Sequence, residues 1–224
     1  MALPTRGTAT SSTGTGATMT PTNTGSSGDW LVAVLLWGTS TRTMSTPATG
    51  WTELGLSDGG SRNYGVYVKQ HSGSESDPDF VLDSTSPHIA YMIPYTGAAE
   101  PVLIANGSGS GTSQTIPAIT TTVDDTAILR AFYGTNGGTP SLSWDDDTEI
   151  DEDSISGNVG GIAENSQATA GSTGTAAISP SKWCMGITLT IGIPPGAGGG
   201  GLLVPPEIIL PVSSQFGSSS RQES

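Results

Sequence analysis

The sequence runs through the same succession of short motifs twice. In each copy an apolar run ends in an aromatic residue followed by Gly-Thr, a Thr-Pro dipeptide precedes a Trp, and a further strand-like segment begins at an Asn. We interpret residues 29–97 and 125–192 as two copies of one multi-strand unit, with chance similarity between Gly/Thr/Ser-rich segments as the alternative. The matched segments are WLVAVLLWGT (30–39) with TAILRAFYGT (126–135), TPATGW (46–51) with TPSLSW (139–144), and NYGVYVKQ (63–70) with NVGGIAENSQ (158–167).

Each copy predicts β-strands rather than helices. Short β-branched and aromatic runs are bounded by Gly, Pro, Asn and Asp, and the chain holds 32 Gly and 15 Pro in 224 residues,. A hydrophobic content of 34% and five Trp favour a packed core over the alternative of a disordered chain,. One unit alone would leave an apolar sheet face bare. We therefore expect an all-β fold in which two quasi-repeated halves pack as an antiparallel β-sandwich of jelly-roll or immunoglobulin-like type.

Alternation along the apolar runs predicts which side chains enter the core. In the second copy Leu129, Ala131 and Tyr133 share one face of a strand, and Arg130 is expected to face water,. The same alternation in the first copy points Ala33, Leu35 and Trp37 inward. We expect the core to form around three large side chains: Trp37, Tyr133 and Trp183.

The two ends of the chain differ in composition from the middle. We divide it into a Thr/Ser/Gly-rich N-terminal arm at residues 1–28, with an edge strand near 17–22, the sandwich at 29–193, and a Gly/Pro-rich C-terminal arm at 194–224,. NGSGSGT at residues 106–112 is interpreted as a flexible connector between the halves.

The C-terminal arm contains an apolar stretch, LLVPPEIILPV, behind a run of glycines. Its three prolines exclude a helix or a central strand. One interpretation is that this stretch docks on a neighbouring subunit, and the alternative is a disordered tail. The candidate docking residues are Leu202, Leu203, Val204, Ile208, Ile209, Leu210 and Val212.

The repeated Thr-Pro/Trp motif has two interpretations. In the first, proline fixes the entry into a strand and the Trp covers the edge of the core. In the second, exposed aromatic rings stack on glycans, for which the candidates are Trp51, Trp144 and Tyr64.

The ionisable residues exclude several functions. Twenty Asp and Glu against seven Lys and Arg give a formal charge of −13, which makes nucleic acid an unsuitable partner,. His71 and His88 stand in no triad or metal-ligand spacing, and no nucleotide-binding motif is present, so we expect neither an enzyme nor a cofactor,.

The single Cys184 lies in an apolar run and is expected to be buried. No segment predicts a membrane span or a signal peptide, so we expect synthesis in the cytoplasm.

The acidic run WDDDTEIDED at residues 144–153 concentrates more functional groups than any other stretch. Ca²⁺ prefers several carboxylate oxygens, and the candidate ligands are Asp145, Asp147, Glu149 and Asp151. The run lacks the spacing and central glycine of an EF-hand loop, and alternate residues of a strand point to opposite faces. A solvated hairpin is therefore the preferred interpretation.

The order of the motifs resembles a β-sandwich domain found in structural proteins of tailed bacteriophages and prophages. The resemblance spans about residues 5–193 and rests on GDWLVAVLLW, PATGWTEL, YGVYVKQ, IPAITTTVDDTAIL and AENSQATAGSTGTAAISPSKWCMGITLTI, in that order. It implies a non-enzymatic component of the virion surface that contacts capsid or tail subunits and further copies of itself. A capsid decoration or cement protein is the first expectation and a tail or fibre module that binds host glycans is the second. A phage hydrolase is a third, weaker one.

Overall fold

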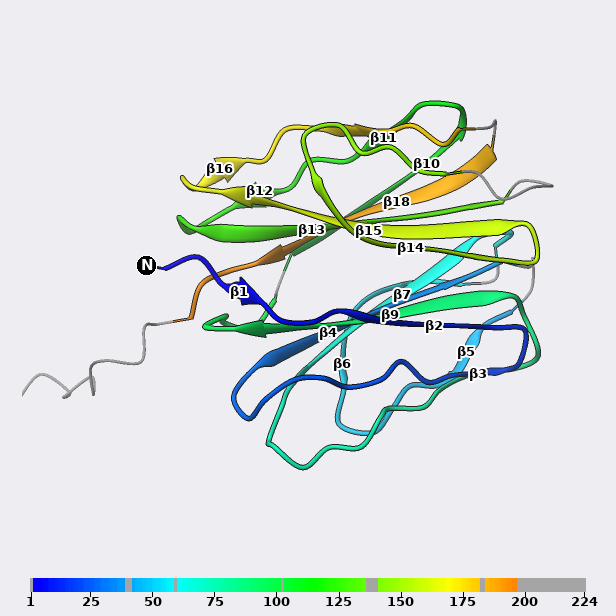
Figure 1. Cartoon of the computed structure of the whole chain (residues 1–224), viewed down its shortest axis with the longest axis horizontal. Coiled ribbons are helices and arrows are strands. Elements are labelled where there is room, and N and C mark those ends of the chain that lie inside the picture. Colours follow the sequence, from blue (N-terminus) through cyan, green and yellow to red (C-terminus); the bar gives the residue numbers. More distant parts are fainter. Residues whose placement is uncertain are drawn as a thin grey trace, which may run out of the picture.

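The fold is all-β, as the sequence predicts. A computed structural model describes residues 2–38, 42–58, 60–101, 103–135, 141–181 and 184–196, and every regular element within these ranges is a β-strand. The strands pair antiparallel throughout and form two large sheets that stack face to face, with smaller sheets outside them (Figure 1). The sandwich architecture is therefore confirmed, and the limits of the three proposed segments stay a prediction.

The first large sheet has six strands in the order β1-β9-β4-β7-β6, with β2 also paired to β9. The N-terminal segment thus supplies the edge strands β1 and β2 to this sheet, and it contributes more strands than the single one expected. The strands are β1 (Thr5–Arg6), β2 (Thr10–Gly14), β4 (Trp30–Trp37), β6 (Thr52–Ser57), β7 (Asn63–Gln70) and β9 (His88–Thr96).

The second large sheet has five strands in the order β10-β18-β13-β15-β14. Its path from β18 to β14 repeats the path β9-β4-β7-β6 of the first sheet, so the two halves share one strand order. The strands are β10 (Leu103–Gly111), β13 (Thr126–Thr135), β14 (Thr148–Ile155), β15 (Asn158–Gln167) and β18 (Cys184–Ile193).

The prediction of a flexible connector at residues 106–112 is wrong, because most of this segment lies in strand β10. This Gly/Ser-rich strand pairs with β18 along its whole length. A close approach favours glycine there: a Cβ on Gly107 would lie 3.0 Å from the Thr188 hydroxyl oxygen, and one on Gly109 would lie 3.3 Å from Gln114.

Small sheets cover the outer faces of both large sheets, which gives four layers where the sequence predicts two (Figure 1). The order β3-β8-β5 covers the first large sheet, and the pairs β11-β17 and β12-β16 lie over the second. These strands are β3 (Thr18–Met19), β5 (Met44–Thr46), β8 (Phe80–Leu82), β11 (Gln114–Ile116), β12 (Thr120–Thr121), β16 (Gly171–Ser172) and β17 (Ala176–Ile178).

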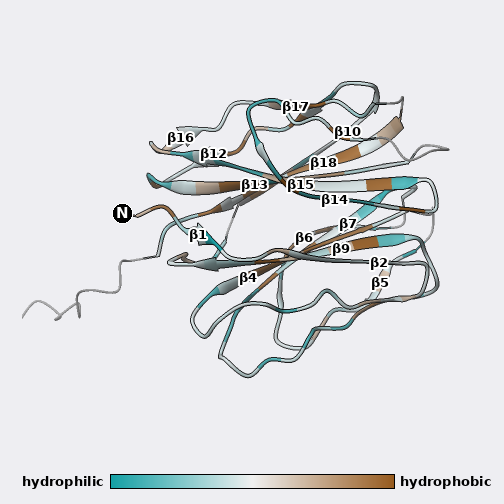
Figure 2. Ribbon diagram, in the orientation of Figure 1, coloured by the Kyte–Doolittle hydropathy of each residue, from teal (hydrophilic) through white to brown (hydrophobic). Residues whose placement is uncertain are grey.

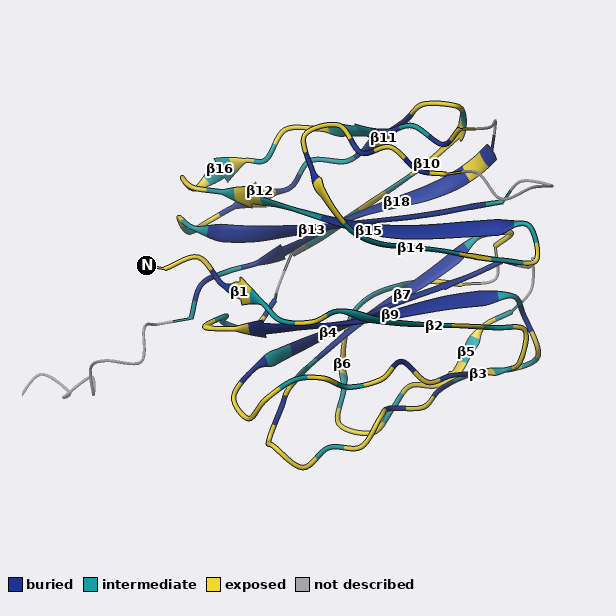
Figure 3. Ribbon diagram, viewed as in Figure 1, coloured by how far each residue is buried: buried dark blue, intermediate teal, exposed yellow. Residues whose placement is uncertain are grey.

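The four layers enclose three apolar cores, and the large sheets are buried on both faces (Figures 2 and 3). Strand β4 shows why its sequence is an unbroken apolar run: Val32, Val34 and Leu36 enter the central core between the large sheets. The residues expected to point inward, Ala33, Leu35 and Trp37, enter the outer core beneath β3, β5 and β8 instead.

Strand β13 confirms one part of the predicted alternation and corrects another. Leu129, Ala131 and Tyr133 share the central core. Arg130 is not in water: its residue is 3% exposed and its guanidinium pairs with Asp147. The outer layers remove this face of the sheet from solvent, so the charge needs a partner. Trp183, the third expected core residue, lies outside the described residues.

Candidate functional site

Of the three aromatic candidates, the structure leaves one accessible. Tyr64 is 3% exposed in the central core and Trp144 is 8% exposed in the outer core of the second half, so neither offers a ring face to a glycan. Trp51 is partly exposed, at the end of the first Thr-Pro/Trp motif. Its ring packs edge-on against Phe80, with ring centroids 5.5 Å apart and an interplanar angle of 70°.

Trp51 lines a pocket of about 480 Å³ between two loops. One wall is the motif at residues 46–51 and the other is the loop at residues 74–79; Leu31, Lys69 and Val81 form further parts of the lining. The volume falls within the range of about 300–1,000 Å³ that is typical of small-ligand pockets. The first copy of the repeated motif therefore forms one side of a cavity.

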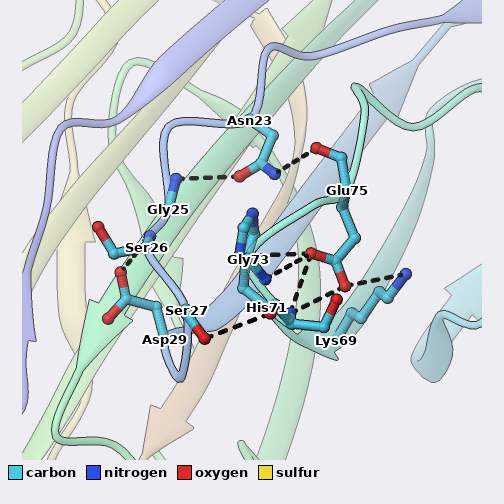
Figure 4. Close-up of polar contacts among 10 residues, drawn as sticks. Asn23, Gly25, Ser26, Ser27, Asp29, Lys69, His71, Gly73 and Glu75 are labelled. Atoms are coloured by element: carbon cyan, nitrogen blue, oxygen red, sulfur yellow. Dashed lines mark hydrogen bonds and ion pairs between the residues drawn. The ribbon is translucent and has the colours of Figure 1, made fainter.

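Glu75 is the best-anchored side chain of this region (Figure 4). Its two carboxylate oxygens each accept a hydrogen bond from the Ser72 backbone N–H at 2.9 Å, and one also accepts from the Gly73 N–H at 3.2 Å. The Lys69 ammonium lies 3.7 Å from the carboxylate. The hydrogen bonds from Ser72 lower the pKa of Glu75 to about 2. Glu75 is thus ionised at neutral pH and fixes one end of the loop.

His71 joins this loop to the N-terminal segment (Figure 4). Its Nδ1 accepts a hydrogen bond from the Gly73 N–H at 2.8 Å, and its backbone exchanges hydrogen bonds with Gly28 and Asp29 at 2.8 Å. The Asp29 carboxylate in turn accepts from the Ser26 N–H at 2.8 Å. The acidic loop is therefore held from two sides.

Two further carboxylates line the pocket with part of their hydrogen-bonding capacity unused. Asp77 Oδ1 accepts from the Asn23 N–H at 2.7 Å, and Asp79 Oδ1 accepts from the Thr20 hydroxyl at 2.6 Å. The Oδ2 atom of each makes no hydrogen bond within the described part of the chain, and both side chains are exposed. The loop is thereby fixed while two negatively charged acceptors stay accessible.

This acidic loop was not among the sites predicted from the sequence. Glu75, Asp77 and Asp79 recur at every second position of GSESDPDF (residues 73–80). This i, i+2 spacing places carboxylates on one side of an extended segment and was the signal that could have found it.

The acidic run of the second half forms no metal site in the described residues, where no group of three or more His, Cys, Asp or Glu side chains could hold an ion. Asp147 forms an ion pair with Arg130, whose Nη1 donates to both carboxylate oxygens at 2.6 and 2.7 Å. Asp145 precedes strand β14, and a bulge lies between Glu149 and Asp151 within it. The run is a turn followed by the edge strand of a hairpin, and the Asp147 side chain within it is buried rather than solvated.

The remaining reactive side chains are buried. His88 is 3% exposed, its Nδ1 lies 3.0 Å from the Ser86 carbonyl oxygen, and burial lowers its pKa. Cys184 is fully buried, as expected, and burial raises the pKa of its thiol.

The seven candidate docking residues between Leu202 and Val212 lie outside the described residues.

The fold and the pocket define an all-β sandwich with a surface cavity of aromatic and acidic lining. No protein-family model, curated protein or solved structure matches the chain. Within the ranges that the structure describes, no helix has the length and apolarity needed to cross a membrane.

Proposed function

We propose that this protein is a non-enzymatic structural component of a tailed-phage particle, and specifically a capsid decoration protein on the outer surface. The support from the sequence is the ordered set of motifs that resembles such domains. Most of these motifs coincide with the central strands of the two large sheets, such as β4, β7 and β18. A formal charge of −13 suits a position away from packaged DNA,.

The observation that carries the proposal is the anchored start of the C-terminal segment. After β18, Pro194 accepts a hydrogen bond from the Ala99 N–H at 2.8 Å, and the Gly196 N–H donates to the Gly97 carbonyl at 2.7 Å. Ala98 and Pro195 form an antiparallel bridge between these bonds. Residues 194–196 are therefore held against the sandwich at a defined point, which suits the start of an attachment segment.

The apolar composition of the segment gives it enough binding energy for that role. Burial of a Leu, Ile or Val side chain contributes about 1.5–3 kcal/mol. LLVPPEIILPV holds seven such residues. A few of them in a groove of a neighbouring virion protein would anchor one copy, and many copies on a lattice would reinforce one another. The proposed partners are capsid subunits and further copies of this chain.

The test is a pair of truncations scored by mass spectrometry of purified particles. Deletion of residues 197–224 keeps the bond from Gly196, so the domain is expected to unfold at the temperature of the full chain but to be absent from particles. Deletion of residues 213–224, which keeps the apolar segment, is the matched control and is expected to incorporate normally. Incorporation of the longer deletion at the level of the full chain would refute the proposal.

A further inference from the structure

We propose that the pocket between residues 46–51 and 74–79 binds a carbohydrate that carries no negative charge, such as a neutral or amino sugar. This assignment does not depend on where the protein sits in a particle. It rests on three properties of the pocket: an aromatic wall, fixed acceptors of hydrogen bonds, and the sign of its charge.

The aromatic wall is Trp51. The edge-on contact with Phe80 holds the indole in place, and the side chain remains partly exposed toward the cavity that it lines. A pyranose ring presents an apolar face of C–H groups, which packs on a flat aromatic surface. The indole N–H donates to no described residue and is free to bind a hydroxyl oxygen. Pro47 adds apolar surface on the same loop.

The fixed acceptors are Asp77 and Asp79. Each carboxylate uses Oδ1 to bind the N-terminal segment, at Asn23 and Thr20 respectively, and keeps Oδ2 for a ligand. The hydrogen bonds already made hold the side chains in place, so less conformational entropy is lost on binding. Sugar hydroxyls donate strongly to charged acceptors. A hydroxyl-rich ligand therefore matches the chemistry of this loop.

The charge of the pocket excludes acidic glycans. Glu75, Asp77 and Asp79 contribute three negative charges, and Lys69 is the cation in the lining. The Lys69 ammonium lies 3.7 Å from the Glu75 carboxylate and is largely neutralised by it. A carboxylated or phosphorylated sugar would be repelled, whereas a neutral sugar meets no such penalty and an amino sugar gains an attraction.

The experiment is a titration of the ¹⁵N-labelled full chain followed by NMR. The probes are the methyl glycosides of glucose, galactose, mannose, N-acetylglucosamine and glucosamine, with N-acetylneuraminic acid as the acidic comparator. At least one uncharged or amino probe is expected to shift the Trp51 indole signal and the amide signals of residues 46–51 and 74–79. The acidic comparator is expected to leave these signals unchanged.

Two variants test the roles of the residues. In Asp77→Asn with Asp79→Asn, each Oδ1 still accepts its bond from the N-terminal segment, while an Nδ2 amide that donates replaces the accepting Oδ2,. This double variant is expected to bind at least about tenfold more weakly. The matched control changes two exposed carboxylates after the second Trp motif, Asp145→Asn with Asp146→Asn, and is expected to bind as the unchanged chain does. Trp51→Leu keeps an apolar contact with Phe80 and is expected to abolish binding.

Three results would overturn the proposal. The first is that none of the uncharged or amino probes shifts signals of the two loops. The second is that a probe shifts signals elsewhere on the molecule instead. The third is equal affinity in the Asp77/Asp79 double variant and its control. Thermal unfolding of every variant shows whether a loss of binding comes from a loss of fold.

Discussion

Removal of Arg130 from its buried ion pair is expected to destabilise the second half of the sandwich strongly. The Arg130 side chain is 4% exposed and that of Asp147 is fully buried. Both Asp147 carboxylate oxygens accept a hydrogen bond from the guanidinium Nη1. Asn165 donates a further hydrogen bond to Asp147 at 3.0 Å. Arg130→Met would leave Asp147 as an uncompensated buried charge, which costs about 3–5 kcal/mol. For a domain of this size that loss lowers the melting temperature by about 6–20 °C.

The assay is urea unfolding followed by circular dichroism. The Nε atom of Arg130 is buried without a hydrogen-bond partner in the described structure, so the pair itself carries a desolvation cost. Arg130→Met combined with Asp147→Leu is therefore expected to be more stable than Arg130→Met alone. A loss below about 1 kcal/mol in the single variant would match a solvent-exposed pair and refute this reasoning. A double variant whose loss equals the sum of both single losses would refute it as well.

Two further variants test the hydrogen bonds of the acidic loop and the close packing of Phe132 on Gly134. Glu75→Gln is expected to be less stable than the unchanged chain by a constant free energy of unfolding above pH 4.5. This difference is expected to shrink as the pH falls toward 2, because the folded-state pKa of Glu75 lies below its unfolded value,. Urea midpoints measured across this range check it, and a difference independent of pH would contradict it. Gly134→Ala is expected to cost about 1–3 kcal/mol, since its Cβ would lie 2.7 Å from the Phe132 ring,. Gly16→Ala, whose nearest atom is 3.9 Å away, is the control, and equal urea midpoints for the two variants would contradict the packing argument.

Period-two alternation and turn residues were sufficient to predict the all-β class and the face shared by Leu129, Ala131 and Tyr133. They predicted strands at several of the short outer segments, including residues 17–22 and 79–83, but not that these strands form separate layers, because strands of two or three residues carry no periodicity that would assign them to a sheet. Arg130 is buried because those layers cover the outer face of its sheet. The Gly/Ser-rich strand β10 was missed for a related reason: its glycines are favoured by neighbours that are close in space and distant in sequence, such as Thr188.

The candidate site shows the same limit. The sequence offered the Trp at the end of each repeated motif as a candidate and gave no reason to separate Trp51 from Trp144. Only the packing separates them, because one ring is partly exposed beside a cavity and the other is buried. The acidic residues that complete the pocket come from a different loop, and their approach to Trp51 depends on the pairing of β8 with β3 and β5.

A glycine lies on the outer face of each large sheet. Gly65 pairs with Leu35 in the first sheet, and Gly161 pairs with Phe132 in the second. Leu35 and Phe132 both enter outer cores, so both glycines face the outer layers. Each glycine leaves a place where a large side chain can lie directly on the sheet.

Different side chains fill that place. In the first half Tyr67, two residues beyond the glycine, lies over it: a Cβ on Gly65 would be 2.8 Å from the Tyr67 ring. In the second half Leu142 and Trp144 lie over Gly161, where a Cβ would be 2.5 Å from Leu142 and 3.2 Å from the Trp144 ring. Trp144 is therefore buried on its sheet, whereas Trp51 packs edge-on against Phe80 and stays partly exposed.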